Sequence, residues 1–337
     1  SFDRLYRNLV LNPPSDAGRA PRGAWLLISD ESSEVTSRLQ PLVEWRRRQG
    51  FPVHAVTTAE TGTSREAIRA YIRQAYETWP VPPEYVVIAG DASGPWSVPC
   101  WREEVSYQRG EGDHPYVMLD GDDLLPEAHV GRLSFSSLAE LQTIVAKTVS
   151  YESSPDIQDP SWFTSACLVG DPNDSGLSTV QLQQWIKTRL RQLNYSRIDT
   201  IFATPFVSQM RTSLNRGVGI FSYRGIYGFS GWTNSLTYQL TNTNRLFFSV
   251  TCTCGTGSFE GGTSYSEAFL RHGSPENLRG SIGSIGTATT GTHTRYNNCY
   301  SMGVWQGLLY EDQWEMGAAH TRGKLEIYLN YQEPEPE

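Results

Sequence analysis

Short continuous hydrophobic runs alternate along the chain with segments in which hydrophobic residues recur every three or four positions. Continuous runs are typical of strands covered on both faces of a sheet, and the recurring spacing is typical of amphipathic helices. Thr63 with Glu66, and Ser137 with Glu140, predict the starts of two of these helices. The strand-like runs of the first half are residues 24–29, 51–56, 85–91 and 127–134.

The second half repeats this alternation of strand-like runs and helical segments. Strands that alternate with helices predict a mostly parallel sheet with helices on both faces. We therefore expect an α/β fold with two such sheets, one within residues 24–134 and one within residues 165–287. The strand-like runs of the second half are residues 165–171, 197–203, 217–223, 245–251 and 279–287.

A polar, proline-containing segment at residues 151–161 separates the two halves and predicts a domain boundary. We expect an N-terminal subdomain at residues 1–150 and a C-terminal subdomain at residues 151–331, which carries the active-site region. Residues 332–337 are acidic and rich in proline, so they are interpreted as the start of a linker. Further domains of the same full-length chain are therefore expected.

Composition excludes several classes of protein. The 337 residues are 38% hydrophobic and carry a net charge of −8, with no block of Lys and Arg, so nucleic acid is not an expected partner. No apolar run approaches the length of a membrane span. The five cysteines are too few for a disulfide scaffold, and their spacing is no zinc pattern.

Two cysteines follow the run at residues 245–251. Cys252 and Cys254 are two positions apart, so they face the same way on an extended strand. A thiol at the end of a strand, followed by Gly255, is well placed as a nucleophile, because nearby N–H groups stabilise a thiolate and an oxyanion. The alternative is that both thiols are buried core residues, as free cysteines often are.

His293 lies in the polar segment after the run at residues 279–287. A histidine at a neighbouring strand end is positioned to reach a thiol at this one, and imidazole is the usual base that activates cysteine. The alternative is a histidine that only forms hydrogen bonds within a polar loop.

The carboxylate-rich stretch LDGDD covers residues 119–123. Asp120, Asp122 and Asp123 resemble a loop that holds calcium through oxygen ligands. The alternative is a solvated acidic turn. We expect no required cofactor beyond such a structural calcium ion.

Two motifs are specific, P-E-x-x-V-G-R-L-S, which starts at Pro126, and T-C-x-T-G-x-F, which starts at Thr253. These and other segments occur in the order found in peptidase family C25, the gingipain-type cysteine peptidases of the caspase-like clan. The chain resembles this family over nearly its whole length. The resemblance implies two caspase-like subdomains, a protein or peptide substrate, and a location outside the cell or on its surface.

The resemblance also implies roles for individual residues. On this match Cys254, not Cys252, is the nucleophile, and Glu127 is the acidic residue that orients the base. In gingipains a loop reading Tyr-x-Gly-His-Gly supplies that base, whereas the matching residues here are Tyr-Arg-Gly-Ile-Tyr at 223–227. Ile226 stands where the histidine would be, and isoleucine cannot accept a proton.

Two functions remain open. The first is a cysteine endopeptidase in which Cys254 attacks the carbonyl carbon and His293 is a non-standard base. The second is a catalytically degenerate domain that serves as a binding or scaffold module of a larger secreted protein. For the peptidase, the loop with Gly225 and Ile226 would frame an oxyanion hole formed by the N–H groups of Cys254 and Tyr227. The residues expected to line its substrate pocket are Trp232, Thr294 and Arg295.

Overall fold

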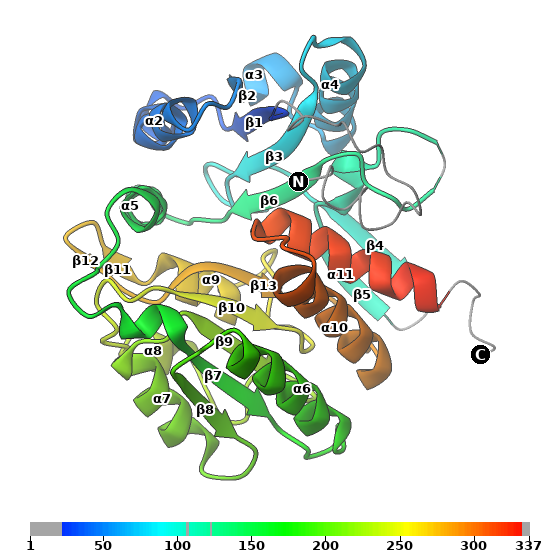
Figure 1. The fold of residues 1–337 in the computed structure, drawn as a ribbon. Helices are drawn as coiled ribbons and strands as arrows, with labels where there is room; N and C mark the ends of the chain where they lie inside the picture. The colour runs from blue at the N-terminus through cyan, green and yellow to red at the C-terminus, as the bar shows by residue number, and fades with distance from the viewer. Residues whose placement is uncertain (1–21, 106–107, 122, 332–337) are drawn as a thin grey trace, which may run out of the picture.

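The computed structural model describes residues 22–105, 108–121 and 123–331. It contains two parallel sheets that lie one beside the other, each with helices on its faces (Figure 1). The predicted α/β class, with two mostly parallel sheets flanked by helices, is confirmed.

The first sheet lies at the top of Figure 1 and is formed by the first half of the chain. Its strand order is β2–β1–β3–β6, and every neighbouring pair is parallel. The bounds are β1 Ala24–Ser29, α2 Ser33–Arg48, β2 Val53–Thr57, α3 Thr58–Thr61, α4 Arg65–Thr78, β3 Pro83–Ala89, β6 His129–Leu133 and α5 Leu138–Ser153.

Alternate residues of β1 face the two sides of this sheet, as expected of a covered strand. Leu26 and Ile28 pack with α4, whereas Trp25 and Leu27 pack with α2 and α5. All six residues of β1 are buried, which explains why the run is continuously hydrophobic rather than alternating.

The second sheet has the order β13–β10–β9–β7–β8 and is also parallel throughout. Its core is divided between a face covered by α6 and α10 and a face covered by α7 and α9, and α11 packs on α10. The bounds are β7 Ser165–Gly170, α6 Ser178–Gln192, β8 Arg197–Ile201, α7 Phe206–Arg216, β9 Ile220–Arg224, α8 Asn234–Thr237, β10 Phe247–Thr251, α9 Tyr265–Arg271, β13 Ser281–Gly286, α10 Thr294–Tyr310 and α11 Met316–Asn330.

Short elements outside the two sheets complete the fold. An antiparallel hairpin, β4 Trp101–Val105 with β5 Gln108–Gly112, comes between β3 and β6 in the chain and was not predicted. A second small hairpin pairs β11 Gly273–Ser274 with β12 Asn277–Leu278. Two short 3₁₀ helices are η1 His114–Val117 and η2 Pro160–Thr164.

The predicted start of α4 was wrong by one residue. Its N-cap is Ser64, whose side chain accepts a hydrogen bond from the Ala67 N–H at 3.1 Å, so Thr63 and Glu66 do not form the predicted capping box. The prediction for α5 is confirmed, because Ser137 caps it by accepting from the Glu140 N–H.

A buried ionic cluster joins the two halves of the molecule. Arg271, at the end of α9, donates to Asp91 at 2.8 Å, to Glu267 at 2.7 Å and to the Ser134 hydroxyl at 2.8 Å. Asp91 and Ser134 follow strands of the first sheet, so this cluster fixes the second sheet against the first. The division of the chain into two subdomains stays a prediction.

Candidate active site

Cys254 and Cys252 lie in different surroundings although they are two residues apart. Cys252 is completely buried, and burial raises the pKa of its thiol to about 12. Cys254 is 6% exposed and lies in the loop that follows β10. The loop at residues 252–260, here called the nucleophile loop, thus separates one core thiol from one thiol at the end of a strand.

Glycines shape the nucleophile loop. Gly255 has φ +73°, a left-handed conformation that favours glycine. At Gly257 a Cβ atom would lie 2.6 Å from the carbonyl carbon of Gly286, so the loop approaches the end of β13 more closely than any side chain permits. Thr256 braces the turn, because its hydroxyl donates to the Thr253 carbonyl at 2.7 Å.

The Cys254 thiol lies against a threonine side chain. The Cys254 Sγ lies 3.2 Å from the Thr292 Oγ1, and the Asn297 amide donates to that same oxygen at 3.0 Å. Since the amide occupies an acceptor position of the hydroxyl, the hydroxyl is free to donate its proton to the sulfur. A donor of this kind stabilises a thiolate, and sequence reasoning missed it.

His293 is adjacent to Thr292 but serves another purpose in this structure. It is the N-cap of α10, where its Nδ1 accepts a hydrogen bond from the Arg295 N–H at 3.2 Å, and its ring is exposed. Among the residues that the structure describes, no hydrogen bond joins His293 to Cys254. The role of His293 as a base stays a prediction.

The loop after β9, at residues 225–228, lies against the nucleophile loop. A backbone bridge pairs Tyr227 with Cys254, and the Gly228 N–H donates to the Cys254 carbonyl at 3.3 Å. The Gly225 N–H is directed at the Thr253 hydroxyl at 3.3 Å. Ile226 is 43% exposed and Tyr227 68%, so both present large apolar surfaces beside the nucleophile.

The hairpin β4–β5 reaches across from the first half to the nucleophile loop and to the loop that leads to His293. One carboxylate oxygen of Glu111 accepts from the Ser258 hydroxyl at 2.7 Å and from the N–H groups of Phe259 and Glu260 at 2.6 and 3.1 Å. Arg109 forms a backbone bridge with Thr290, in the loop that leads to His293. The hairpin therefore ties the nucleophile loop and the His293 loop together.

Glu127 closes a turn before β6. Its Oε2 accepts from the N–H groups of Leu119 and Asp120 at 2.6 and 3.1 Å. The Glu127 carboxylate is therefore already hydrogen-bonded to backbone N–H groups. Its role in orienting a base stays a prediction.

The three residues expected in the substrate pocket are placed differently from one another. Trp232 is 2% exposed, packs in the core of the second sheet and donates to the Thr237 hydroxyl at 2.9 Å, so it corresponds to a core residue rather than a pocket wall. Thr294 is the first residue of α10, and the Arg295 guanidinium lies over the rings of Tyr296 and Tyr331.

In the acidic loop that begins at residue 119, aspartate side chains accept hydrogen bonds from nearby backbone N–H groups. Asp120 accepts from the Gly121 N–H at 3.0 Å and Asp123 from the Leu125 N–H at 2.8 Å, while Asp122 lies outside the described residues. In the described part of the chain, no three His, Cys, Asp or Glu residues are grouped so as to hold a metal ion. Calcium binding therefore stays a prediction.

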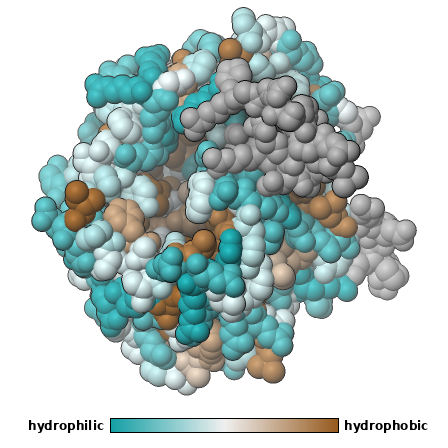
Figure 2. Space-filling view, viewed as in Figure 1, coloured by the Kyte–Doolittle hydropathy of each residue, from teal (hydrophilic) through white to brown (hydrophobic). Residues whose placement is uncertain are grey.

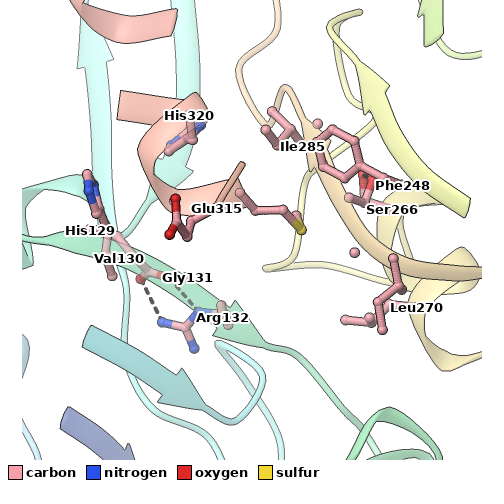
Figure 3. A pocket seen from close by; sticks show the side chains of 18 of the residues that line it. His129, Val130, Gly131, Arg132, Phe248, Ser266, Leu270, Ile285, Glu315 and His320 are labelled. Carbon is pink, nitrogen blue, oxygen red and sulfur yellow. Dashed lines mark hydrogen bonds and ion pairs between the residues drawn. The ribbon is translucent and has the colours of Figure 1, made fainter. Parts of the chain in front are cut away.

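A cavity of about 1040 Å³ lies between the two halves. Figure 2 shows a hollow on this face of the molecule, with hydrophobic side chains inside it. In Figure 3, residues 129–132 of β6 lie on one side of this space and Phe248 and Ile285 of the second sheet on the other, with Glu315 and His320 between them. The lining includes Thr292, so the cavity reaches the residue that contacts Cys254.

The model of Peptidase family C25 matches residues 20–336 of the chain. The chain belongs to peptidase family C25. It is 24% identical to Gingipain R2 of Porphyromonas gingivalis over 279 residues, which are 77% of this chain and 36% of the relative. It is 27% identical to a Lys-gingipain of the same organism over 280 residues, which are 77% of this chain and 15% of the relative.

Solved structures of gingipains share the fold. The crystal structure of the Arg-specific cysteine proteinase gingipain R superposes with a TM-score of 0.81 at 19% identity, covering 96% of this chain and 76% of that one. A complex of the pro- and mature domains of Porphyromonas gingivalis RgpB gives the same TM-score and covers 92% and 75%. The caspase-like assignment of the fold is thereby confirmed.

The chain spans about a third of Gingipain R2, the first of these relatives, and a smaller share of the Lys-gingipain. Within the described residues, no helix combines the length and the apolar character that crossing a membrane requires.

Proposed function

We propose that this chain is a cysteine endopeptidase whose nucleophile is Cys254. The observation that carries the proposal is the position of the Cys254 thiol: it lies at the carboxyl end of β10, against the hydroxyl of Thr292 and beside the exposed loop at residues 225–228. A peptide bond laid along that loop would place its carbonyl carbon near the sulfur. Membership of a peptidase family supports the same reading.

In the proposed reaction, the Cys254 thiol gives its proton to His293, the sulfur forms a bond to the substrate carbonyl carbon, and the carbonyl oxygen becomes an oxyanion stabilised by the N–H groups of Cys254 and Tyr227. When the oxyanion collapses, the carbon–nitrogen bond breaks and the leaving nitrogen takes the proton from His293. Water then hydrolyses the acyl-enzyme, which releases the second product and restores the thiol.

His293 is the proposed carrier of the proton. Its Nδ1 now caps α10, so the ring must leave the cap to take up a proton at that nitrogen. His293 follows directly after Thr292, whose hydroxyl lies 3.2 Å from the Cys254 sulfur, and in the proposed mechanism a change of side-chain rotamer turns the His293 ring toward that sulfur. We propose that substrate binding favours this rotamer.

The remaining proposals concern the setting of the enzyme. Its substrates are proteins or peptides, it acts outside the cell or on its surface, and it is one domain of a longer chain. A calcium ion bound by Asp120, Asp122 and Asp123 would have a structural role. The calcium proposal rests on the carboxylates of this stretch, and the others rest on the family and on the share of its relatives that the chain spans.

A peptide-library cleavage assay with calcium tests the proposed function. Wild type should cleave, Cys254→Ala should be inactive, and His293→Ala should lose about 10²–10⁴ in rate, the usual contribution of a general base. His293→Asn is the sharper variant, because asparagine also caps helices but cannot take up a proton at neutral pH. It should be as impaired as His293→Ala.

The second candidate function is the degenerate domain, which the isoleucine at position 226 favours. In that case wild type would bind peptides without cleaving them, also after limited proteolysis to remove any inhibitory segment. Cleavage that survives in both His293 variants would instead keep the peptidase and remove His293 from its mechanism.

A further inference from the structure

A positively charged side chain is buried directly beneath the nucleophile loop. Arg224, the last residue of β9, has no exposed surface. Its Nη1 donates to the Cys252 carbonyl, its Nε donates to the Asn298 side chain at 2.8 Å, and its Nη2 is directed at the Thr294 carbonyl at 3.4 Å. The guanidinium thus joins the nucleophile loop to the first turns of α10.

All of these partners are neutral. None of the ion pairs among the described residues involves Arg224, whereas Arg132 pairs with Asp113 at 2.7 Å and Arg271 pairs with Asp91 and Glu267. Buried charges are normally paired, because removing an ion from water is costly. Arg224 departs from that rule at the one place where the proposed chemistry creates negative charge.

The cation cannot easily escape its burial by losing a proton. Burial lowers the pKa of Arg224 to about 10, which still leaves it charged at neutral pH. Lys147 is also fully buried and held by the Phe269 and Leu270 carbonyls, but burial lowers its pKa well below the ordinary value of a lysine. A lysine in such a place can become neutral, and an arginine much less so.

The titratable groups that face Arg224 are few. Those that act on its charge are the thiols of Cys252 and Cys254 and the phenol of Tyr223. The carboxylate of Asp171, at the end of β7, is engaged by the Ser230 hydroxyl and by the Asn173 N–H at 2.9 Å. On α10, the nearest members are the neutral Thr294 and Asn298, with His293 capping the helix.

We propose that Arg224 is a positioning residue that supplies the fixed positive charge for Cys254, stabilising its thiolate and the oxyanion formed at the same place. It stands two residues before Ile226, so the strand end that lacks a histidine delivers a permanent cation instead. Arg224 acts by its field and by holding the Cys252 carbonyl, and it transfers no proton. The inference rests on the proposed function only in taking Cys254 as the nucleophile.

The test is the rate at which Cys254 is alkylated by iodoacetamide as a function of pH, followed by mass spectrometry. This readout needs no peptide cleavage, so it remains decisive if the peptidase proposal fails. In Arg224→Gln the midpoint of the pH profile should rise by about one unit or more, which is about a tenfold lower rate at pH 7. Arg224→Lys should recover the wild-type profile only in part, because a buried lysine loses its proton more readily than an arginine.

Arg322→Gln is the matched control. Arg322, in α11, is a buried arginine paired with Glu311 at 2.9 Å and Glu326 at 2.6 Å. Its loss should lower the melting temperature without moving the alkylation profile. A profile that moves equally in Arg322→Gln and Arg224→Gln, or that does not move in Arg224→Gln, overturns the proposal.

A measurement on the wild type covers the case in which Arg224→Gln does not fold. A nearby cation attracts an anionic reagent, so the ratio of the iodoacetate rate to the iodoacetamide rate should be several-fold higher at Cys254 than for N-acetylcysteine. An equal or lower ratio at Cys254 contradicts a positive field at the sulfur.

Discussion

Two buried arginines about fifty residues apart in the sequence have opposite surroundings. Arg271, between the two halves, is held by Asp91, Glu267 and Ser134, so its charge is neutralised where it lies. Arg224, beneath the nucleophile loop, is held by carbonyl, hydroxyl and amide oxygens only. The first arrangement fixes two sheets against each other, and the second leaves a net positive charge beside a thiol. The difference separates a charge that serves the fold from one that is available for chemistry.

The largest expected effect is on stability, at the paired arginine. Arg271→Met leaves Asp91 and Glu267 buried without their cation, which should lower the free energy of unfolding by about 3–5 kcal/mol. Denaturant unfolding measures it. Arg224→Met should cost less, about 1–3 kcal/mol, because it leaves neutral groups unsatisfied. A larger loss of unfolding free energy in Arg224→Met than in Arg271→Met would contradict the proposed difference between the two arginines.

The histidines between the two halves predict a loss of stability in acid. Burial lowers the pKa of His129 to about 3 and that of His114 to about 4, and it lowers the pKa of His320 as well. The unfolded chain takes up these protons first, near pH 6.5. The stability that is present above that pH is therefore lost as the pH falls from 6.5 toward 4, by up to about 1.4 kcal/mol per pH unit for each group.

Melting temperatures at pH 7.0, 5.5 and 4.5 test this expectation. His129→Gln should flatten the dependence, because a neutral amide can still bond with the Thr321 hydroxyl that now lies 2.9 Å from the His129 ring. A melting temperature that stays constant down to pH 4.5 would contradict it.

A smaller effect is expected at the β4–β5 hairpin, which contacts both the nucleophile loop and the loop that leads to His293. Glu111→Gln weakens three hydrogen bonds to the nucleophile loop, so peptide cleavage should fall about tenfold while the melting temperature changes little. Glu104→Gln, on the same hairpin, is the control, since Glu104 forms an exposed ion pair with Arg109. Surface pairs of that kind contribute about 0–1 kcal/mol. Equal activity in both variants would remove the hairpin from the site.

The smallest effect concerns the helix cap at His293. His293→Ala should destabilise the protein by about 0.5–2 kcal/mol through loss of the cap, whereas His293→Asn should have almost no effect on stability. Denaturant unfolding of both variants separates this structural role from any loss of activity. Equal stability of the two variants would mean that the cap is worth nothing.

The sequence was sufficient for the two sheets because their strands are buried on both faces, which leaves a continuous hydrophobic signal. The β4–β5 hairpin has no such signal, since WREEV and QRGEG are mostly polar and depend on contacts with distant loops. The strand-end position pointed to the pair Cys252 and Cys254, because strand ends meet at one edge of a parallel sheet, whereas the choice of Cys254 came from the resemblance to family C25.

Other features of the site depend on the direction in which a side chain points and on contacts with distant segments, and residue spacing in the sequence does not encode either. Thr292 and His293 are neighbours, and only the start of α10 decides which one faces the sulfur. Trp232 was expected at a cleft and is instead in the core. The burial of Arg224 has no local signature, because arginine is mostly an exposed residue and its carbonyl partners come from other segments.

We propose that Cys254 is a nucleophile although isoleucine stands at position 226, where gingipains carry the histidine that serves as the base. The most direct measurement is intact-mass spectrometry after treatment with a set of peptidyl acyloxymethyl ketones that differ in the residue before the reactive group. These probes need a nucleophilic thiol and a site that accepts a peptide. We expect one covalent adduct of probe and protein, located on Cys254 and absent from Cys254→Ala. Unmodified protein with every probe, while iodoacetamide still labels Cys254, would contradict it.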